Sequence, residues 1–131
     1  VIEYFDQFEV INVLEEWKRV LMPGGTLRIA VPNFLSLINI YNQTGEIDKI
    51  LGPLYGRWST DYGEFIYHKT VYDKKSLIRL LENCGYSDIQ EWDWREVFEN
   101  TKNYDDHSQA YYPHMDKAKG IHVSLNLECK K

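Results

Sequence analysis

The first clear pattern in this chain is a run of apolar residues at helical spacing, formed by Val10, Val13, Leu14, Trp17, Val20 and Leu21. Polar residues occupy the opposite face, where Glu15 and Arg19 are spaced to pair at i,i+4. Asp6 precedes the run as a candidate N-cap, and Glu9 follows it at capping-box spacing. The pattern predicts an amphipathic helix between Asp6 and Leu21. The apolar residues 1–5 before it are expected to form the tail of a strand.

A turn, a strand and a second helix are predicted next. Pro23, Gly24 and Gly25 stop the first helix, because proline cannot continue it and glycine permits a positive φ. Residues 26–31 alternate between apolar and other side chains, as a strand does, and Pro32 ends them. Asn33 can cap the next helix, and Gly45 can close it. Its expected apolar stripe is Phe34, Leu37, Ile38 and Tyr41.

The second half of the chain continues this alternation of helices and strands. Residues 46–51 fit a short helical piece, and residues 52–70 form a loop rich in glycine and aromatic residues. Asp73 caps a predicted helix that Gly85 ends, with Leu77, Leu80, Leu81 and Cys84 on one stripe.

Two further strands are predicted at residues 88–94 and 121–129, separated by a long polar stretch at 99–120. In the last strand the odd-numbered residues are apolar and the even-numbered ones polar. The sequence therefore predicts a single domain, residues 1–131, of the α/β class.

Composition narrows the possible partners. A hydrophobic share of 44% indicates a globular chain, and a net charge of −5 argues against binding to nucleic acid. No apolar run approaches the ~20 residues that cross a bilayer, so no membrane association is expected. Cys84 and Cys129 lie in apolar stripes outside any CxxC motif. They are expected to be reduced core thiols of a cytoplasmic protein.

The segment 14–32, with its helix, Leu21-Met22-Pro23-Gly24-Gly25 turn and strand, resembles the second half of class I S-adenosylmethionine-dependent methyltransferases. The first five residues resemble the motif after that family's fourth strand, often Val-Leu-Glu-His-Phe, with Tyr4 in place of the histidine. Residues 68–70, 83–86 and 124–128 also resemble later parts of such enzymes. The resemblance covers nearly the whole chain.

The resemblance implies a partial Rossmann-like methyltransferase fold, consisting of the C-terminal half of the sheet with flanking helices. In the family's strand order, the strands at 26–31 and 88–94 flank the antiparallel strand at 121–129. S-adenosylmethionine is the implied cofactor, and Ile2, Glu3 and Tyr4 would line its methionine end. The glycine-rich cofactor loop of the family has no counterpart, because no Gly-x-Gly occurs in the sequence. We therefore expect this chain to be an incomplete member of the family. Alone, it should bind the cofactor weakly or not at all and be inactive.

The implied reaction is methyl transfer to a small-molecule or glycan-like acceptor. His68 is the candidate general base, with Tyr55, Arg57 and Tyr67 as candidate acceptor contacts. The simpler alternative for His68 is a structural hydrogen bond to a backbone carbonyl. The simpler alternative for the loop aromatics is packing onto the sheet.

The sequence leaves two other functions open. The strand at 26–31 should leave an apolar edge open, so a homodimer through this edge or through the arm 1–5 is expected. The alternative function is accordingly a non-catalytic oligomerisation or binding domain derived from a methyltransferase. A metal-dependent hydrolase would use Asp105, Asp106, His107, His114 and Asp116, but their spacing fits no standard metal motif, and no metal site is predicted.

Overall fold

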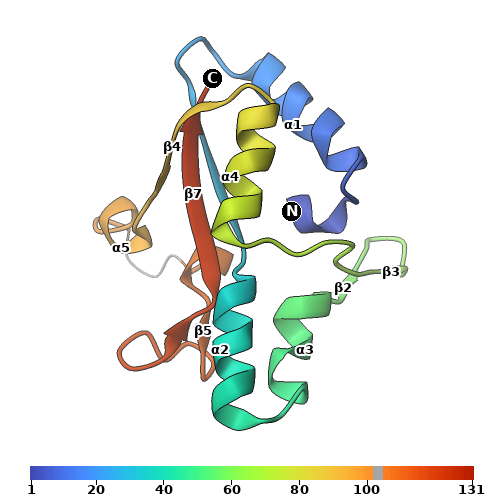
Figure 1. The fold of residues 1–131 in the computed structure, drawn as a ribbon, viewed down its shortest axis with the longest axis vertical. Helices are drawn as coiled ribbons and strands as arrows, with labels where there is room; N and C mark the ends of the chain where they lie inside the picture. The colour runs from blue at the N-terminus through green and yellow to red at the C-terminus, as the bar shows by residue number, and fades with distance from the viewer. Residues whose placement is uncertain (102–104) are drawn as a thin grey trace.

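The computed structural model describes residues 1–101 and 105–131 as a mixed α/β structure with antiparallel sheets (Figure 1). The elements of the first half are η1 (Ile2–Tyr4), α1 (Glu9–Val20), β1 (Thr26–Pro32), α2 (Phe34–Thr44), α3 (Asp48–Tyr55), β2 (Trp58–Ser59) and β3 (Phe65–Ile66). Those of the second half are α4 (Lys74–Asn83), β4 (Ser87–Glu91), α5 (Trp94–Val97), η2 (His107–Gln109), β5 (Tyr111–Tyr112), β6 (Ile121–His122) and β7 (Ser124–Lys130).

The main sheet has the strand order β1–β7–β4. β7 is antiparallel to both neighbours, pairing Leu127 with Ile29 of β1 and with Glu91 of β4. The predicted order, with the last strand in the middle, is confirmed. Since β1 and β4 run in the same direction, their carboxyl ends meet at one edge of the sheet.

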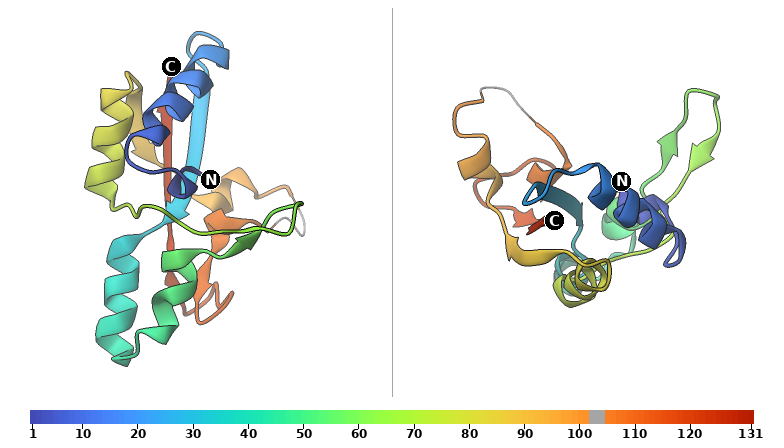
Figure 2. Two further views of the ribbon diagram at one scale, coloured as in Figure 1. Left: turned by 90° about the vertical axis from the view of Figure 1, so that its right-hand side faces the viewer. Right: turned by 90° about the horizontal axis from the view of Figure 1, so that it is seen from above.

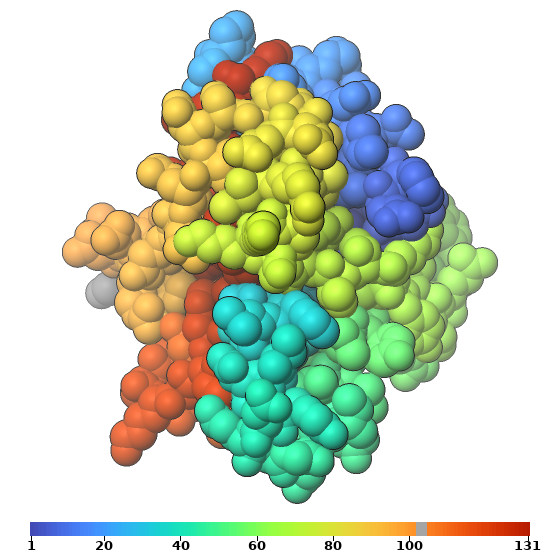
Figure 3. Space-filling model, viewed as in Figure 1, coloured from blue at the N-terminus to red at the C-terminus, as the bar shows by residue number. Residues whose placement is uncertain are grey.

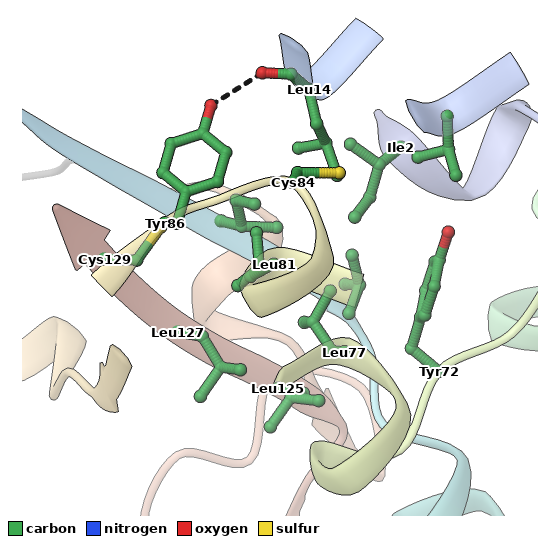
Figure 4. Packing of buried hydrophobic residues seen from close by; sticks show 13 residues of the cluster. Ile2, Leu14, Tyr72, Leu77, Leu81, Cys84, Tyr86, Leu125, Leu127 and Cys129 are labelled. Carbon is green, nitrogen blue, oxygen red and sulfur yellow. Dashed lines mark hydrogen bonds between the residues drawn. The ribbon is translucent and has the colours of Figure 1, made fainter. Parts of the chain in front are cut away.

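Helices α1 and α4 cover one face of this sheet, and the segment around α5 and η2 covers the other (Figures 1 and 2). The core under the two helices is made of apolar side chains from α1, α4, β1 and β7, among them Val10, Leu14, Ile29, Val31, Leu77, Leu81, Leu125 and Leu127. The Tyr86 hydroxyl donates a 2.8 Å hydrogen bond to the Leu14 carbonyl inside this core (Figure 4). Cys84 and Cys129 are buried and unpaired, as predicted.

The predicted helix caps form. Asp6 Oδ1 accepts from the backbone nitrogens of Phe8 and Glu9 at 2.8 and 2.9 Å, and Glu9 Oε2 accepts from the Asp6 nitrogen at 3.0 Å. Asp73 caps α4 in a capping box with Ser76, and Asn33 caps α2. The predicted Glu15–Arg19 pair is wrong, because Arg19 instead binds Glu16 one turn away, with nitrogen–oxygen distances of 2.7 and 2.8 Å.

The predicted apolar stripe of α2 is also wrong. Leu37 is buried, but Phe34, Ile38 and Tyr41 are exposed. α2 lies beyond the carboxyl edge of the sheet and packs against α3 (Figure 1). The helix therefore buries the side that faces α3, and Leu37 and Ile40 join Ile50 and Val123 in a second small core.

The N-terminal and loop segments differ from the expected pattern. Residues 2–4 form a 3-10 turn rather than the tail of a strand. The predicted loop 52–70 contains the end of α3 and the β2–β3 hairpin, which projects away from the main sheet (Figures 1 and 2). β4 ends at Glu91, because Asp93 caps α5. The predicted last strand is divided at Val123 into β6 and β7.

Both faces of β7 are buried, which its alternating sequence does not show. Ser124 and Asn126 point away from the helical face, yet both are buried, because the segment around η2 covers them. In the described parts of the chain, no helix has the length and apolar content that a membrane crossing requires.

Candidate functional site

The 3-10 turn η1 is joined to the segment that follows the β2–β3 hairpin. The Glu3 carbonyl accepts hydrogen bonds from the backbone nitrogens of Lys69 and Thr70 at 2.8 and 3.3 Å. These bonds bring the side chains of Glu3 and Tyr4, from one end of the chain, next to His68. Three of the residues predicted from sequence to serve cofactor and catalysis therefore lie together.

The imidazole of His68 is almost enclosed, with 7% of its side chain exposed. Its Nδ1 lies 3.1 Å from the Pro53 carbonyl, which can only accept, so Nδ1 carries the proton of this bond. Nε2 lies 3.7 Å from Glu3 Oε1. Burial lowers the pKa of His68, although the Glu3 carboxylate opposes this shift. This shift favours the neutral ring, in which Nε2 carries a lone pair.

Tyr4 and Gly56 enclose the other sides of this imidazole. The Tyr4 ring meets the His68 ring edge-on, with centroids 4.7 Å apart, and its hydroxyl donates to the Gly56 carbonyl at 2.8 Å. Gly56 has a φ of +50°, and the His68 ring occupies the space that a Cβ at this position would need. Burial, with help from the Glu3 charge, raises the pKa of Tyr4. The simpler expectation for His68, a structural bond to a backbone carbonyl, is thus realised in the fold.

A buried hydroxyl lies close to the same carboxylate. Tyr72 is buried, and within the described residues its hydroxyl has no hydrogen bond of normal geometry. Burial and the nearby Glu3 charge raise the pKa of Tyr72 to about 12, and an interaction with the Thr70 side chain opposes this shift. Because this hydroxyl oxygen is buried, a ligand reaches it only after neighbouring side chains move.

The remaining predicted site residues are more dispersed. Ile2 is fully buried in the main core, so its side chain has no accessible surface for a ligand. Tyr55 and Tyr67 are exposed. Of these two residues, Tyr55 contacts His68 through its backbone: the Tyr55 carbonyl accepts a 2.8 Å hydrogen bond from the His68 backbone nitrogen. The Arg57 guanidinium lies 3.7 Å above the Phe65 ring on the hairpin.

The expectation that the loop aromatics pack onto the sheet is wrong. The five concerned are all exposed: Tyr55, Trp58, Tyr62, Phe65 and Tyr67. They are carried by α3, the projecting hairpin and the residues after it, which hold them away from both cores.

The three aspartates between 105 and 116 have structural partners. Asp106 caps η2 by accepting from the Ser108 nitrogen at 2.9 Å. Asp116 accepts from the Lys119 nitrogen at 3.0 Å, and Asp105 lies 3.5 Å from the Lys117 ammonium. Over residues 1–101 and 105–131, no group of three His, Cys, Asp or Glu side chains is arranged to hold a metal.

A cleft that the sequence analysis did not predict lies at the carboxyl edge of the sheet. It has a volume of about 480 Å³ and is lined by Asn33, residues 91–96, His122, Ser124, Leu125 and Asn126. In Figure 3 the red surface of β7 is visible in the hollow between the yellow β4 region and the cyan α2. Ligands of open α/β sheets bind outside the carboxyl ends of the strands, so this cleft lies in a favourable place.

The floor of the cleft is a fixed polar network. His122 Nε2 and Asn126 Nδ2 both donate to the Ser108 carbonyl, at 2.8 and 3.0 Å, and Ser124 Oγ donates to Asn126 Oδ1 at 2.8 Å. Because these side chains are tied to one another, they are already oriented before any ligand arrives.

The sequence did contain a signal for this cleft. Trp92, Asp93, Trp94 and Arg95 combine two large aromatics with two opposite charges at the end of the predicted strand 88–94. The sequence predicts that residues 92–94 belong to the strand, and this hides their place at the carboxyl edge of the sheet. In the structure Asp93 Oδ1 accepts from the Arg95 nitrogen at 2.8 Å, which ends the strand and starts α5.

In comparisons with known proteins, no family model and no curated protein matches this chain.

Proposed function

We propose that this chain forms the acceptor side of an S-adenosylmethionine-dependent methyltransferase domain with a Rossmann-like fold. The observation that carries the proposal is the sheet order β1–β7–β4, in which an antiparallel last strand separates two parallel strands. This order agrees with the C-terminal half of that enzyme family. The helix α1, the Pro23-Gly24-Gly25 turn and β1 support the proposal by their sequence and by their order along the chain.

Glu3, Tyr4, His68 and Tyr72, which we call the Glu3 cluster, have a chemistry that suits the cofactor. S-adenosylmethionine carries a positive sulfonium, and a carboxylate and aromatic rings favour a cation next to them. Glu3, Tyr4 and Tyr72 supply one carboxylate and two phenol rings. In the proposal these residues hold the methionine end of the cofactor. The cofactor supplies the electrophilic methyl group.

His68 is the proposed general base. In methyl transfer a bond forms from the acceptor oxygen or nitrogen to the methyl carbon while the sulfur–methyl bond breaks. The electron pair of that bond stays on sulfur, and the acceptor proton goes to a base. The Nε2 lone pair of neutral His68 can take this proton. Because 7% of the side chain is exposed, this role requires Gly56 and Tyr4 to move away from the ring.

The direct test is calorimetric titration of the protein with S-adenosylmethionine, which carries the sulfonium charge. The proposal predicts weak one-to-one binding that Glu3→Gln reduces. Glu9→Gln, a substitution of an exposed glutamate paired with Lys69 at 2.8 Å, is the matched control and should leave binding unchanged. Absence of binding to the folded wild-type protein, or equal binding by the Glu3 variant, would contradict the proposal.

A second function, assembly without catalysis, is favoured by the exposed apolar surface. β1 pairs with β7 on one side, and within the described residues no strand pairs with its other edge. Large apolar side chains are exposed on α2 and on the β2–β3 hairpin, including Leu35, Ile38, Tyr41, Trp58 and Phe65. Sedimentation velocity tests this function: a homodimer supports it, and a monomer at every concentration measured contradicts it.

A further inference from the structure

The two tryptophans of the cleft lie among charged groups of both signs. The Trp94 ring has the Arg95 guanidinium 4.7 Å and the Lys117 ammonium 4.9 Å from its centroid. Arg95 is held in place by the Tyr111 hydroxyl, 2.8 Å away. The Trp92 ring has the Arg28 guanidinium 5.8 Å from its centroid. Protein cations therefore already lie over both tryptophan rings, which disfavours a cationic ligand there.

Carboxylates at the rim disfavour an anionic ligand as well. Glu91, Asp93 and Glu96 line the cleft, against the single guanidinium of Arg95. Glu91 is partly neutralised by Lys74, 2.8 Å from its carboxylate, but the described residues of the lining keep an excess of negative charge. A phosphate or a sulfate would approach carboxylates at close range, which is unfavourable.

A neutral ligand with many hydroxyl groups avoids both unfavourable interactions, the repulsion of a cation by the basic groups and that of an anion by the carboxylates. Hydroxyls donate to the rim carboxylates and accept from Arg95, and the carbon faces of a sugar ring pack on an indole. The indole N–H groups of Trp92 and Trp94 are buried and lack an acceptor within the described residues. The floor at His122, Ser124 and Asn126 is polar and fixed by the hydrogen bonds given above. The volume of about 480 Å³ falls within the range of small-molecule sites.

We propose that this cleft, over the carboxyl ends of β1 and β4, binds a neutral sugar. The binding does not depend on methyl transfer. Only the role of the sugar as methyl acceptor rests on the proposed function. Trp92 and Trp94 form the aromatic wall against which the sugar packs, and Glu96 and Asp93 accept from sugar hydroxyls.

Saturation-transfer NMR tests the proposal with the methyl α-glycosides of glucose, mannose and galactose at millimolar concentration. We expect saturation of the sugar ring protons for the wild-type protein. Trp94→Ala should weaken the affinity about tenfold or more. Trp58→Ala, which removes an exposed tryptophan of the β2–β3 hairpin, should leave it unchanged.

Because Trp94 contacts Tyr111 and its replacement can disturb the fold, Glu96→Gln provides a second variant at an exposed position. Its matched control is Glu82→Gln at an exposed position on α4, and only the Glu96 variant should bind the glycosides more weakly. Lack of saturation for all three glycosides, loss with Trp58→Ala but not Trp94→Ala, or tighter binding of glucose 6-phosphate than of glucose would overturn the proposal. Since the assay contains no S-adenosyl compound, its failure is distinct from failure of the proposed function.

Discussion

The carboxylate of Glu3 and the imidazole of His68 lie 3.7 Å apart, with 10% and 7% of their side chains exposed. One residue precedes α1 and the other follows β3, so the contact joins the start of the described chain to the segment after the hairpin. Tyr4, Gly56 and Pro53 complete the enclosure of the ring. This cluster is at once a structural junction and the proposed cofactor end of the site.

The first prediction concerns pH. Burial lowers the pKa of His68 in the folded protein below its ordinary value of 6.5. At a pH between the folded-state pKa and 6.5, the unfolded chain therefore binds a proton that the folded protein does not. The free energy of unfolding therefore rises with pH in this window, and it falls as the pH drops below 6.5. Urea unfolding followed by circular dichroism at several pH values measures this.

His68→Asn should remove this part of the pH dependence, because asparagine keeps a donor near the Pro53 carbonyl and does not titrate. His107→Asn, at an exposed position, is the control and should keep the wild-type profile. Carboxylates with lowered pKa values, such as Asp6 and Asp73, change the free energy of unfolding at lower pH, so they do not interfere with this measurement. A profile that is identical in the wild type and the His68 variant would contradict the prediction.

The second prediction concerns Gly56. Gly56→Ala places a methyl group where the His68 ring lies and imposes a side chain on a φ of +50°. We expect a loss of about 2–4 kcal/mol in the free energy of unfolding, from strain and overpacking together. Gly63→Ala isolates the backbone contribution, because Gly63 has a φ of +79° with open space around it. Equal losses for the two variants would show that the ring does not occupy this space.

The third prediction concerns the buried hydrogen bond of Tyr86. Tyr86→Phe removes the donor to the Leu14 carbonyl and should lower the free energy of unfolding by about 1 kcal/mol. Tyr62→Phe is the control, since Tyr62 is 94% exposed, and should have no effect. Chemical unfolding of both variants measures the difference, and a Tyr86 variant as stable as the wild type would refute the assigned bond.

The fourth prediction concerns the thiols. Burial raises the pKa of Cys129 to about 11 and also raises the pKa of Cys84. Since the thiolate is the reactive form, both cysteines should react slowly with a disulfide reagent at neutral pH and rapidly after unfolding in urea. Rapid reaction of either thiol in the folded protein would contradict this assignment.

The helices and strands with local signals were predictable from sequence. Asp6, Asn33 and Asp73 cap helices through their own side chains, and β1 and β7 follow strict alternation, so each signal lies within a few residues. The strand order came from the family resemblance and is confirmed by the sheet.

Features that depend on distant partners were not predictable. The buried side of α2 is decided by α3, and the burial of Ser124 and Asn126 by the segment around η2. Glu3 and His68 were both identified as site residues, but no local pattern shows that they meet. The cleft was missed because Asp93 ends the strand early to cap α5, which turns two tryptophans toward the carboxyl edge of the sheet.

The most direct test of the methyltransferase account is a ¹⁵N–¹H NMR titration of the protein with S-adenosylmethionine. The account predicts that amide shifts change with increasing ligand at residues 2–4, at His68 and at Tyr72. Tyr62, on the projecting hairpin, serves as an internal reference that should not shift. Spectra that stay unchanged at millimolar ligand, or shifts confined to residues outside the Glu3 cluster, would contradict the account.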